Sequence, residues 1–241
     1  MKGKINIIIL TVVASVISTS MIMKYNSKAT NDAKSVETSK VDEYVSEVNA
    51  TFDSTSQDEL IEDEEPQYIE VDSTMPYYIR INNLKNVVNV YSKVEDKVYE
   101  PYKVMLCSTG KATPKSGEIH KTTTLKCRWS IMKGGVYVQY ATQIVDSIFF
   151  HSVPYTKENA STLEYWEYDK LGEAASLGCI RLTAENAKWI YDNIEEGTCV
   201  EFYEDENPGP FGKPEGVKIS DNELCRGWDP TDIADGNPWN T

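Results

Sequence analysis

The chain has 241 residues, a length that accommodates one domain with extensions or two small domains. Forty per cent of the residues are hydrophobic, which is enough for a packed core and excludes a wholly disordered chain. The formal net charge of -14 and the scattered positions of Lys and Arg argue against nucleic acid as a partner, because neutralising phosphates requires clustered cations.

The N-terminal segment has the features of a membrane anchor. Residues 5–23 form an uncharged apolar run, close to the roughly 20 residues that a bilayer-spanning helix needs, and Lys2 and Lys4 precede it. A cleaved signal peptide has a shorter apolar region and a small-residue cleavage site. We therefore favour a retained anchor over residues 1–24, with cleavage and secretion as the alternative. In either case we expect the rest of the chain on the cell-wall side of the membrane, although the lysines that follow the apolar run do not by themselves indicate this orientation.

The next segment, residues 25–67, is polar and rich in Ser and Thr, and then becomes acidic. There is no basic residue between Lys40 and Arg80, whereas seven Asp and Glu residues lie within residues 53–65. Such a charge run repels itself and stays solvated. It predicts a flexible, disordered acidic stalk.

Residues 68–204 carry the pattern of a folded domain with many strands. Over residues 77–93, Ile79 and Ile81 and then Val88 and Val90 alternate with polar positions, which predicts a hairpin. Further strands are expected within residues 100–110, 122–131, 134–145, 147–155 and 197–205. Short strands at this spacing, separated by Gly and Pro turns, favour a mainly β sandwich or barrel.

One helix is expected near the end of this domain. Thr183 is a suitable N-cap, although Asn186 occupies the position where a capping box has Glu or Gln. Apolar residues then recur at near-helical spacing up to Asn193. Residues 205–241 are rich in Pro, Gly and Asp, and we expect an irregular C-terminal tail.

Cys179 and His151 are the candidates for nucleophilic chemistry. Cys179 follows a turn of small residues and precedes the expected helix, and a helix N-terminus lowers the pKa of a thiol. Gly178 permits a close approach of the backbone to a substrate. His151 follows the apolar run of residues 148–150, and His120 is the only other histidine. On spacing alone, a structural cysteine and a structural histidine remain the alternatives.

The cysteine count allows more than one arrangement. Five cysteines outside the cytoplasm leave at least one thiol unpaired. If Cys179 is that thiol, three pairings are open to Cys107, Cys127, Cys199 and Cys225. The alternative is that several of them are small buried apolar residues.

Two segments resemble the active-site signature of the L,D-transpeptidase catalytic-domain family. "FFHSVPY" (residues 149–155) and "ASLGCIRLT" (residues 175–183) are similar to the family's H-S-x-P-[WY] segment and its downstream [ST]-H-G-C motif. A T-P-x-x-G element begins at Thr113. The resemblance covers residues 68–204 and is to Gram-positive, clostridial-type members. It implies an L,D-transpeptidase-like β-sandwich with the cysteine at the start of a short helix.

The resemblance also implies roles for individual residues. Cys179 is then the nucleophile, His151 the general base, and the Ser152 backbone carbonyl the group that orients the imidazole. The N–H groups of Gly178 and Cys179 form an oxyanion hole, and Arg181 positions the substrate or braces the motif. Further candidates for substrate binding are Ser176, Tyr137, Gln139 and Tyr155, with ordinary sheet packing as the alternative for the two tyrosines.

The implied reaction is acyl transfer on peptidoglycan tetrapeptide stems. Cys179 attacks the carbonyl between the third residue and the terminal D-Ala, D-Ala leaves, and a neighbouring stem's amine takes the acyl group as a 3-3 cross-link. If water attacks instead, the enzyme is an L,D-carboxypeptidase. No metal or organic cofactor is expected, and we expect a monomer. Carbapenem-type β-lactams are expected to acylate the cysteine.

One position departs from the family pattern. Leu177 stands where the motif usually has His, directly before Gly178 and Cys179. If that His is indispensable, the chain is a catalytically inert wall-binding homologue. A sortase would take its Arg from a separate strand, and a papain-like hydrolase would place Cys before His, so chain order and spacing disfavour both.

Overall fold

The computed structural model describes residues 67–240. The expected anchor and all but the last residue of the expected stalk lie outside these residues. Within residues 67–240, no helix combines the length and the apolar character that crossing a bilayer requires.

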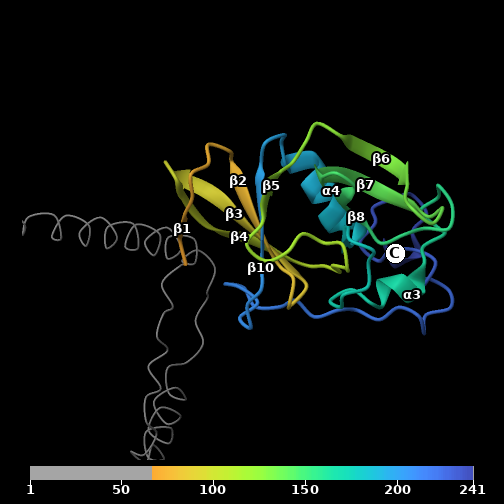
Figure 1. The fold of residues 1–241 in the computed structure, drawn as a ribbon. Helices are drawn as coiled ribbons and strands as arrows, with labels where there is room; N and C mark the ends of the chain where they lie inside the picture. Colours follow the sequence, from red (N-terminus) through yellow and green to blue (C-terminus); the bar gives the residue numbers. More distant parts are fainter. Residues whose placement is uncertain (1–66, 241) are drawn as a thin grey trace, which may run out of the picture. The chain divides into compact units, whose positions relative to one another are not determined.

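Two β-sheets form the described region, which confirms the mainly β prediction (Figure 1). The first sheet has the order β1-β4-β3-β2-β10-β5, and the second has the order β6-β7-β8-β9. The first sheet contains β1 (Ile69–Glu70), β2 (Tyr77–Asn82), β3 (Val87–Glu95), β4 (Val98–Leu106), β5 (Ile119–Lys121) and β10 (Cys199–Tyr203). The second contains β6 (Lys126–Ile131), β7 (Tyr137–Val145), β8 (Ile148–Ser152) and β9 (Ile180–Leu182). The helices are α3 (Tyr165–Tyr168), α4 (Ala184–Asn193) and the 3-10 turn η1 (Pro238–Asn240).

The predicted hairpin is formed by β2 and β3. Ile79 pairs with Val90 and Ile81 with Val88, and all four side chains are buried. Because successive side chains of a strand point to opposite faces, Arg80 lies on the other face, where it forms an ion pair with Glu201 of β10. The alternation in the sequence therefore assigns the correct face to each residue.

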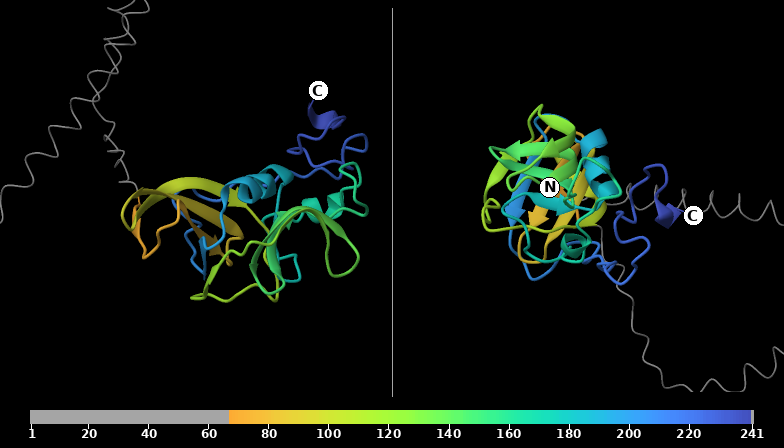
Figure 2. Two further views of the ribbon diagram at one scale, coloured as in Figure 1. Left: turned by 90° about the horizontal axis from the view of Figure 1, so that it is seen from above. Right: turned by 90° about the vertical axis from the view of Figure 1, so that its right-hand side faces the viewer.

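The core lies between the two sheets and against α4. It joins apolar side chains of β2, β3, β4 and β10 to those of β7, β8 and β9, and α4 contributes Ala187 and Ile190. Figure 2 shows α4 beside the strands of the second sheet. Burial of this helix face fixes the position of the segment that precedes it, which contains β9 and Cys179.

Two pairs of strands, each formed by segments that are far apart in the sequence, run parallel. These pairs position the site. Strand β10, which matches the strand expected within residues 197–205, lies inside the first sheet, parallel to β2. Strand β9 is parallel to β8, with Phe150 opposite Ile180 and His151 opposite Arg181. Strand β9 has only three residues and α3 only four, too few for a periodic pattern, and the sequence did not predict either.

The N-terminus of α4 is capped by its own N-cap residue and by the C-terminal tail. Thr183 Oγ1 accepts from Asn186 N at 3.3 Å, which confirms the predicted N-cap. Asp229 Oδ2 accepts from Ala184 N at 2.8 Å, and Thr231 Oγ1 accepts from Glu185 N at 3.1 Å. Residues 205–240 contain no α-helix or strand, yet they satisfy the first amides of α4.

Candidate active site

A cavity of about 380 Å³ lies beside β8 and β9, and we call it the catalytic cavity. Both Cys179 and His151 line it, so the structure brings together the two residues that the sequence singled out. The turn between β6 and β7 contributes the other wall. The lining from this turn consists of Ile131, Met132, Lys133 and Val136.

Cys179 lies directly before β9, and this corrects the expectation that it sits at the start of a helix. Helix α4 begins only at Ala184, after β9 and the N-cap, so its N-terminal amides are not available to the thiol. Cys179 Sγ instead lies 3.4 Å from the carbonyl oxygen of Ser147. Burial raises the pKa of the Cys179 thiol, although a hydrogen bond from the Phe149 backbone and the charge of Arg181 oppose this effect.

His151 is buried at the end of β8, and its ring is held by the adjacent backbone. His151 Nδ1 lies 2.6 Å from the carbonyl oxygen of Ser152. Because a carbonyl only accepts, Nδ1 carries the proton and Nε2 is left as the accepting atom. Burial lowers the pKa of His151 to about 4, and the positive charge of Arg181 lowers it further, against the hydrogen bond to Ser152. The resting pair is therefore a neutral thiol and a neutral imidazole.

The turn before Cys179 is closed by Ser176. Ser176 Oγ donates to the Cys179 carbonyl at 2.6 Å and accepts from Gly178 N at 3.0 Å. The Gly178 amide is therefore already engaged, and its expected role in an oxyanion hole is wrong for this conformation. Within residues 67–240 the Cys179 amide contacts only its own sulfur, which leaves it as the backbone donor beside the nucleophile.

The T-P-x-x-G element packs against this turn. Thr113 Oγ1 donates to the Gly178 carbonyl at 2.7 Å and accepts from Gly110 N at 2.8 Å. A Cβ added at Gly178 would lie 2.9 Å from Ile148 Cδ1 and 3.0 Å from Ala112 Cβ. Glycine is thus required at position 178 by close packing on both sides.

Arg181 lines the catalytic cavity but is committed to an ion pair. Its Nη1 contacts Glu167 Oε2 of α3, and both side chains are largely buried, with exposed fractions of 15% and 16%. Arg181 therefore connects the cysteine motif to α3. Of its two expected roles, positioning the substrate or bracing the motif, this contact supports the second. Glu167 was not predicted as a site residue, because an isolated acidic residue in a one-turn helix gives no signal in the sequence.

Three of the expected substrate-binding residues do not line the catalytic cavity. Gln139 and Tyr155 are fully buried, so their expected place in the groove is wrong. Gln139 Nε2 donates to Asp232 Oδ2 at 2.7 Å, and its backbone N donates to Ser152 Oγ at 2.9 Å. Tyr137 forms a backbone pair with Tyr155 and packs beside it in a second apolar cluster, so it too is a packing residue.

Lys133 and Leu177 line the catalytic cavity, although neither was expected to do so. Lys133 lies on the β6–β7 turn and, among residues 67–240, has no ion-pair partner. Lys133 and Arg181 are the charged residues of the described lining, so the cavity is cationic in an acidic chain. Leu177, at the position of the family's motif His, also lines the cavity and is 66% exposed.

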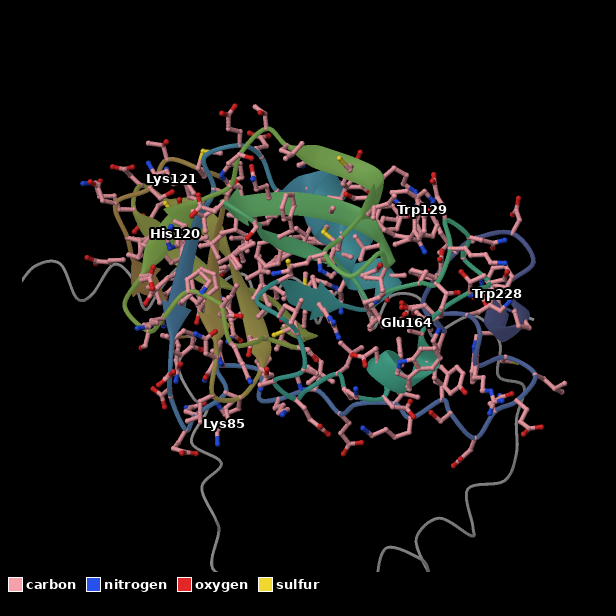
Figure 3. All side chains as sticks on the ribbon, turned by 45° about the vertical axis from the view of Figure 1, so that its right-hand side comes forward. Lys85, His120, Lys121, Trp129, Glu164 and Trp228 are labelled. Carbon is pink, nitrogen blue, oxygen red and sulfur yellow. The ribbon has the colours of Figure 1, made fainter. Side chains whose placement is uncertain are left out.

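The other histidine and the other cysteines lie outside the catalytic cavity. His120 belongs to β5 of the first sheet, where its Nε2 lies 3.1 Å from Glu118 Oε2. In Figure 3 it lies on the opposite side of the view from Trp129, Glu164 and Trp228. All five thiols are unpaired, and Cys107 and Cys199 are buried. No three His, Cys, Asp or Glu residues within residues 67–240 converge as metal ligands would.

Comparison with known proteins connects this arrangement to one family. The profile described as "YkuD: L,D-transpeptidase catalytic domain" matches residues 67–202. A Bacillus subtilis (strain 168) protein, provisionally named as the L,D-transpeptidase YciB, is 55% identical over 51 residues, which are 21% of this chain and 25% of that protein.

Solved structures of L,D-transpeptidases are similar to part of this chain. An L,D-transpeptidase from Mycobacterium smegmatis is 21% identical with a TM-score of 0.41, and covers 53% of this chain and 58% of that one. An L,D-transpeptidase from Mycobacterium tuberculosis H37Rv is 24% identical with a TM-score of 0.40, and covers 54% and 58%. The chain thus spans a quarter of the curated relative and somewhat over half of these structures.

Proposed function

Because the chain belongs to the L,D-transpeptidase catalytic-domain family, we propose that it transfers acyl groups between peptidoglycan stem peptides through a thioester on Cys179. The observation that carries the proposal is the shared catalytic cavity of Cys179 and His151. The bond from His151 Nδ1 to the Ser152 carbonyl supports it, because this bond leaves Nε2 as the base.

The first step forms the acyl-enzyme. His151 Nε2 takes the thiol proton as Cys179 Sγ attacks the carbonyl that joins the third stem residue to the terminal D-Ala. The Cys179 amide donates to the oxygen that becomes negative. The C–N bond then breaks, the imidazolium gives its proton to the departing amine of D-Ala, and a thioester remains.

The second step releases the product. An amine on a neighbouring stem loses a proton to His151 and attacks the thioester, so that the S–C bond breaks and the thiol is restored. The product is a 3-3 cross-link between two stems. When water takes the place of the amine, the product is a trimmed tripeptide stem, which is the L,D-carboxypeptidase alternative.

The cationic lining supports a donor that ends in a free carboxylate. Lys133 is unpaired on the turn that borders the catalytic cavity, whereas Arg181 is neutralised by Glu167. We assign to Lys133 the carboxylate of the terminal D-Ala, since an exposed ammonium on a turn attracts an anion without losing a buried partner.

The neighbourhood of Leu177 supports catalysis rather than an inert wall-binding role. The His151–Ser152 contact involves residues 151 and 152 alone, so the base is oriented whichever residue occupies position 177. Leu177 adds an apolar side chain to the wall of the catalytic cavity and contributes no charge that would compete with His151. We further propose that the apolar run of residues 5–23 holds a monomeric enzyme at the outer face of the membrane.

The test uses the full chain with a purified disaccharide-tetrapeptide and follows D-Ala release by mass spectrometry. Wild type and the matched control Cys127→Ala, which removes a half-buried thiol outside the catalytic cavity, are expected to release D-Ala. Cys179→Ala is expected to bind without release. Binding without release by wild type would contradict the proposal and favour the inert homologue. The ratio of cross-linked dimer to tripeptide separates transpeptidase from carboxypeptidase.

A further inference from the structure

A second cavity, of about 410 Å³, lies against α3 and the C-terminal tail, and we call it the Trp166 cavity. It takes residues from the loop after β8, from α3 and from the tail. The lining residues that matter here are Thr156, Lys157, Tyr165, Trp166, Glu223 and Arg226. The acyl-transfer mechanism uses none of them.

The Trp166 cavity combines an aromatic face with unpaired polar groups. Trp166 is 45% exposed and lies edge-to-face with Tyr165, with ring centroids 5.0 Å apart. The Arg226 guanidinium lies 4.7 Å from the centre of the Tyr165 ring. Among residues 67–240, Lys157 and Glu223 have no ion-pair partner.

These groups match the chemistry of a sugar ring. A pyranose has a face of C–H groups, which fits against the electron-rich face of an aromatic ring, and a rim of hydroxyl and amide groups that need both donors and acceptors. A stretch of apolar peptide would leave the charges of Lys157 and Glu223 unmatched. The mixture of an aromatic face with charges of both signs therefore favours a carbohydrate.

The two cavities lie next to each other on one stretch of backbone. Pro154 lines the catalytic cavity and Thr156 lines the Trp166 cavity. Tyr155, between them, is buried and exchanges two backbone hydrogen bonds with Tyr137, so the backbone is extended at Tyr155. Alternate residues of an extended segment point to the same side, and two residues span about 7 Å.

We propose that the Trp166 cavity binds the glycan that carries the stem peptide, with a sugar ring against Trp166. This inference rests on the proposed function and adds a glycan subsite to it. A stem whose third carbonyl lies at Cys179 extends at most about 10 Å over three residues to its sugar. That length exceeds the span of about 7 Å between Pro154 and Thr156, which line the two cavities. Glu167, which neighbours Trp166, also holds Arg181, so α3 connects the subsite to the cysteine motif.

The test compares two donors on the full chain, the disaccharide-tetrapeptide and the free tetrapeptide. For Trp166→Ala, the ratio of kcat/KM with glycan to kcat/KM without glycan is expected to fall about tenfold, mainly through KM. Trp166→Phe, which keeps an aromatic face, is expected to restore most of the ratio. Phe211→Ala, a matched loss of an exposed aromatic residue outside both cavities, is expected to keep the wild-type ratio.

A ratio that is the same in Trp166→Ala and wild type would overturn the proposal. Equal losses with both donors would also overturn it and would assign the Trp166 cavity to peptide. If wild type releases D-Ala from neither donor, the proposed function fails, and the subsite is then tested by titrating Cys179→Ala with the stem-free disaccharide. Saturable binding that Trp166→Ala abolishes would support a glycan site, and no binding would overturn it.

Discussion

Lowering the pH from 7.5 to 5.0 is expected to leave acyl-enzyme formation almost unchanged, which is unusual for a histidine base. Burial lowers the pKa of His151 from its ordinary value of 6.5 to about 4. A shift of that size means that charging the ring in the protein costs about 3 kcal/mol more than in water. The base is competent when neutral, so kcat/KM rises with pH through about 4 and is flat above about 5.

The two possible pKa values of His151, about 4 and 6.5, predict clearly different rates at pH 5.0. At pH 5.0, about 90% of His151 is neutral if its pKa is about 4, but only about 3% is neutral if its pKa is 6.5. The two cases differ about 30-fold in kcat/KM at that pH. The measurement is D-Ala release at substrate concentrations below KM, from pH 4.5 to 8.0. Tryptophan fluorescence at each pH excludes unfolding, since all five tryptophans lie between residues 129 and 239.

A half-maximal rate near pH 6.5 would refute this reasoning, because it would mean that the ring is solvated before the substrate binds. His120→Ala is the matched control, since His120 lies in the other sheet beside Glu118. It is expected to retain the wild-type profile.

Two further predictions concern stability. Burial raises the pKa of Asp229 from 3.8 to about 6, so the folded state holds this proton more tightly than the unfolded state does. Its contribution is present below about pH 4 and is lost as the pH rises through about 6. The free energy of unfolding of wild type relative to Asp229→Asn is therefore expected to fall by about 2 kcal/mol from pH 4 to pH 7 in urea titrations, and parallel curves would contradict this. Gly178→Ala is expected to lower the free energy of unfolding by about 1–3 kcal/mol, because the new methyl group meets Ile148 and Ala112, and an unchanged midpoint would contradict the packing argument.

The sequence predicted the parts of the fold that depend on local periodicity. Alternation at Ile79, Ile81, Val88 and Val90 is a property of one short segment, and so is the N-cap at Thr183. The structure contains both. Pairing between distant segments has no such local signal. The parallel contact of β8 with β9 is therefore absent from the sequence-based description, although it aligns His151 with the cysteine motif.

The same reason explains the errors at the site. Gln139 and Tyr155 were expected in the groove because of the resemblance to the family. Gln139 is buried against Asp232 of the C-terminal tail and Tyr155 is paired with Tyr137 of β7, and neither contact between distant segments has a local signal in the sequence. The short strand β9 separates Cys179 from α4, and three residues are too few to be recognised between a turn and a helix.

The position of Asp229 after α4 in the chain has a consequence for biosynthesis. The Asp229 carboxylate accepts the hydrogen bond from the first amide of α4. The ribosome, however, adds Asp229 dozens of residues after that helix. A nascent chain that stops where the family match ends, at residue 202, exposes uncapped helix amides and lacks the Asp232 partner of Gln139. The N-terminus of α4 and the Gln139 side chain therefore gain these partners only after residues 229 and 232 have been made, and a protease that cuts before Asp229 would remove both.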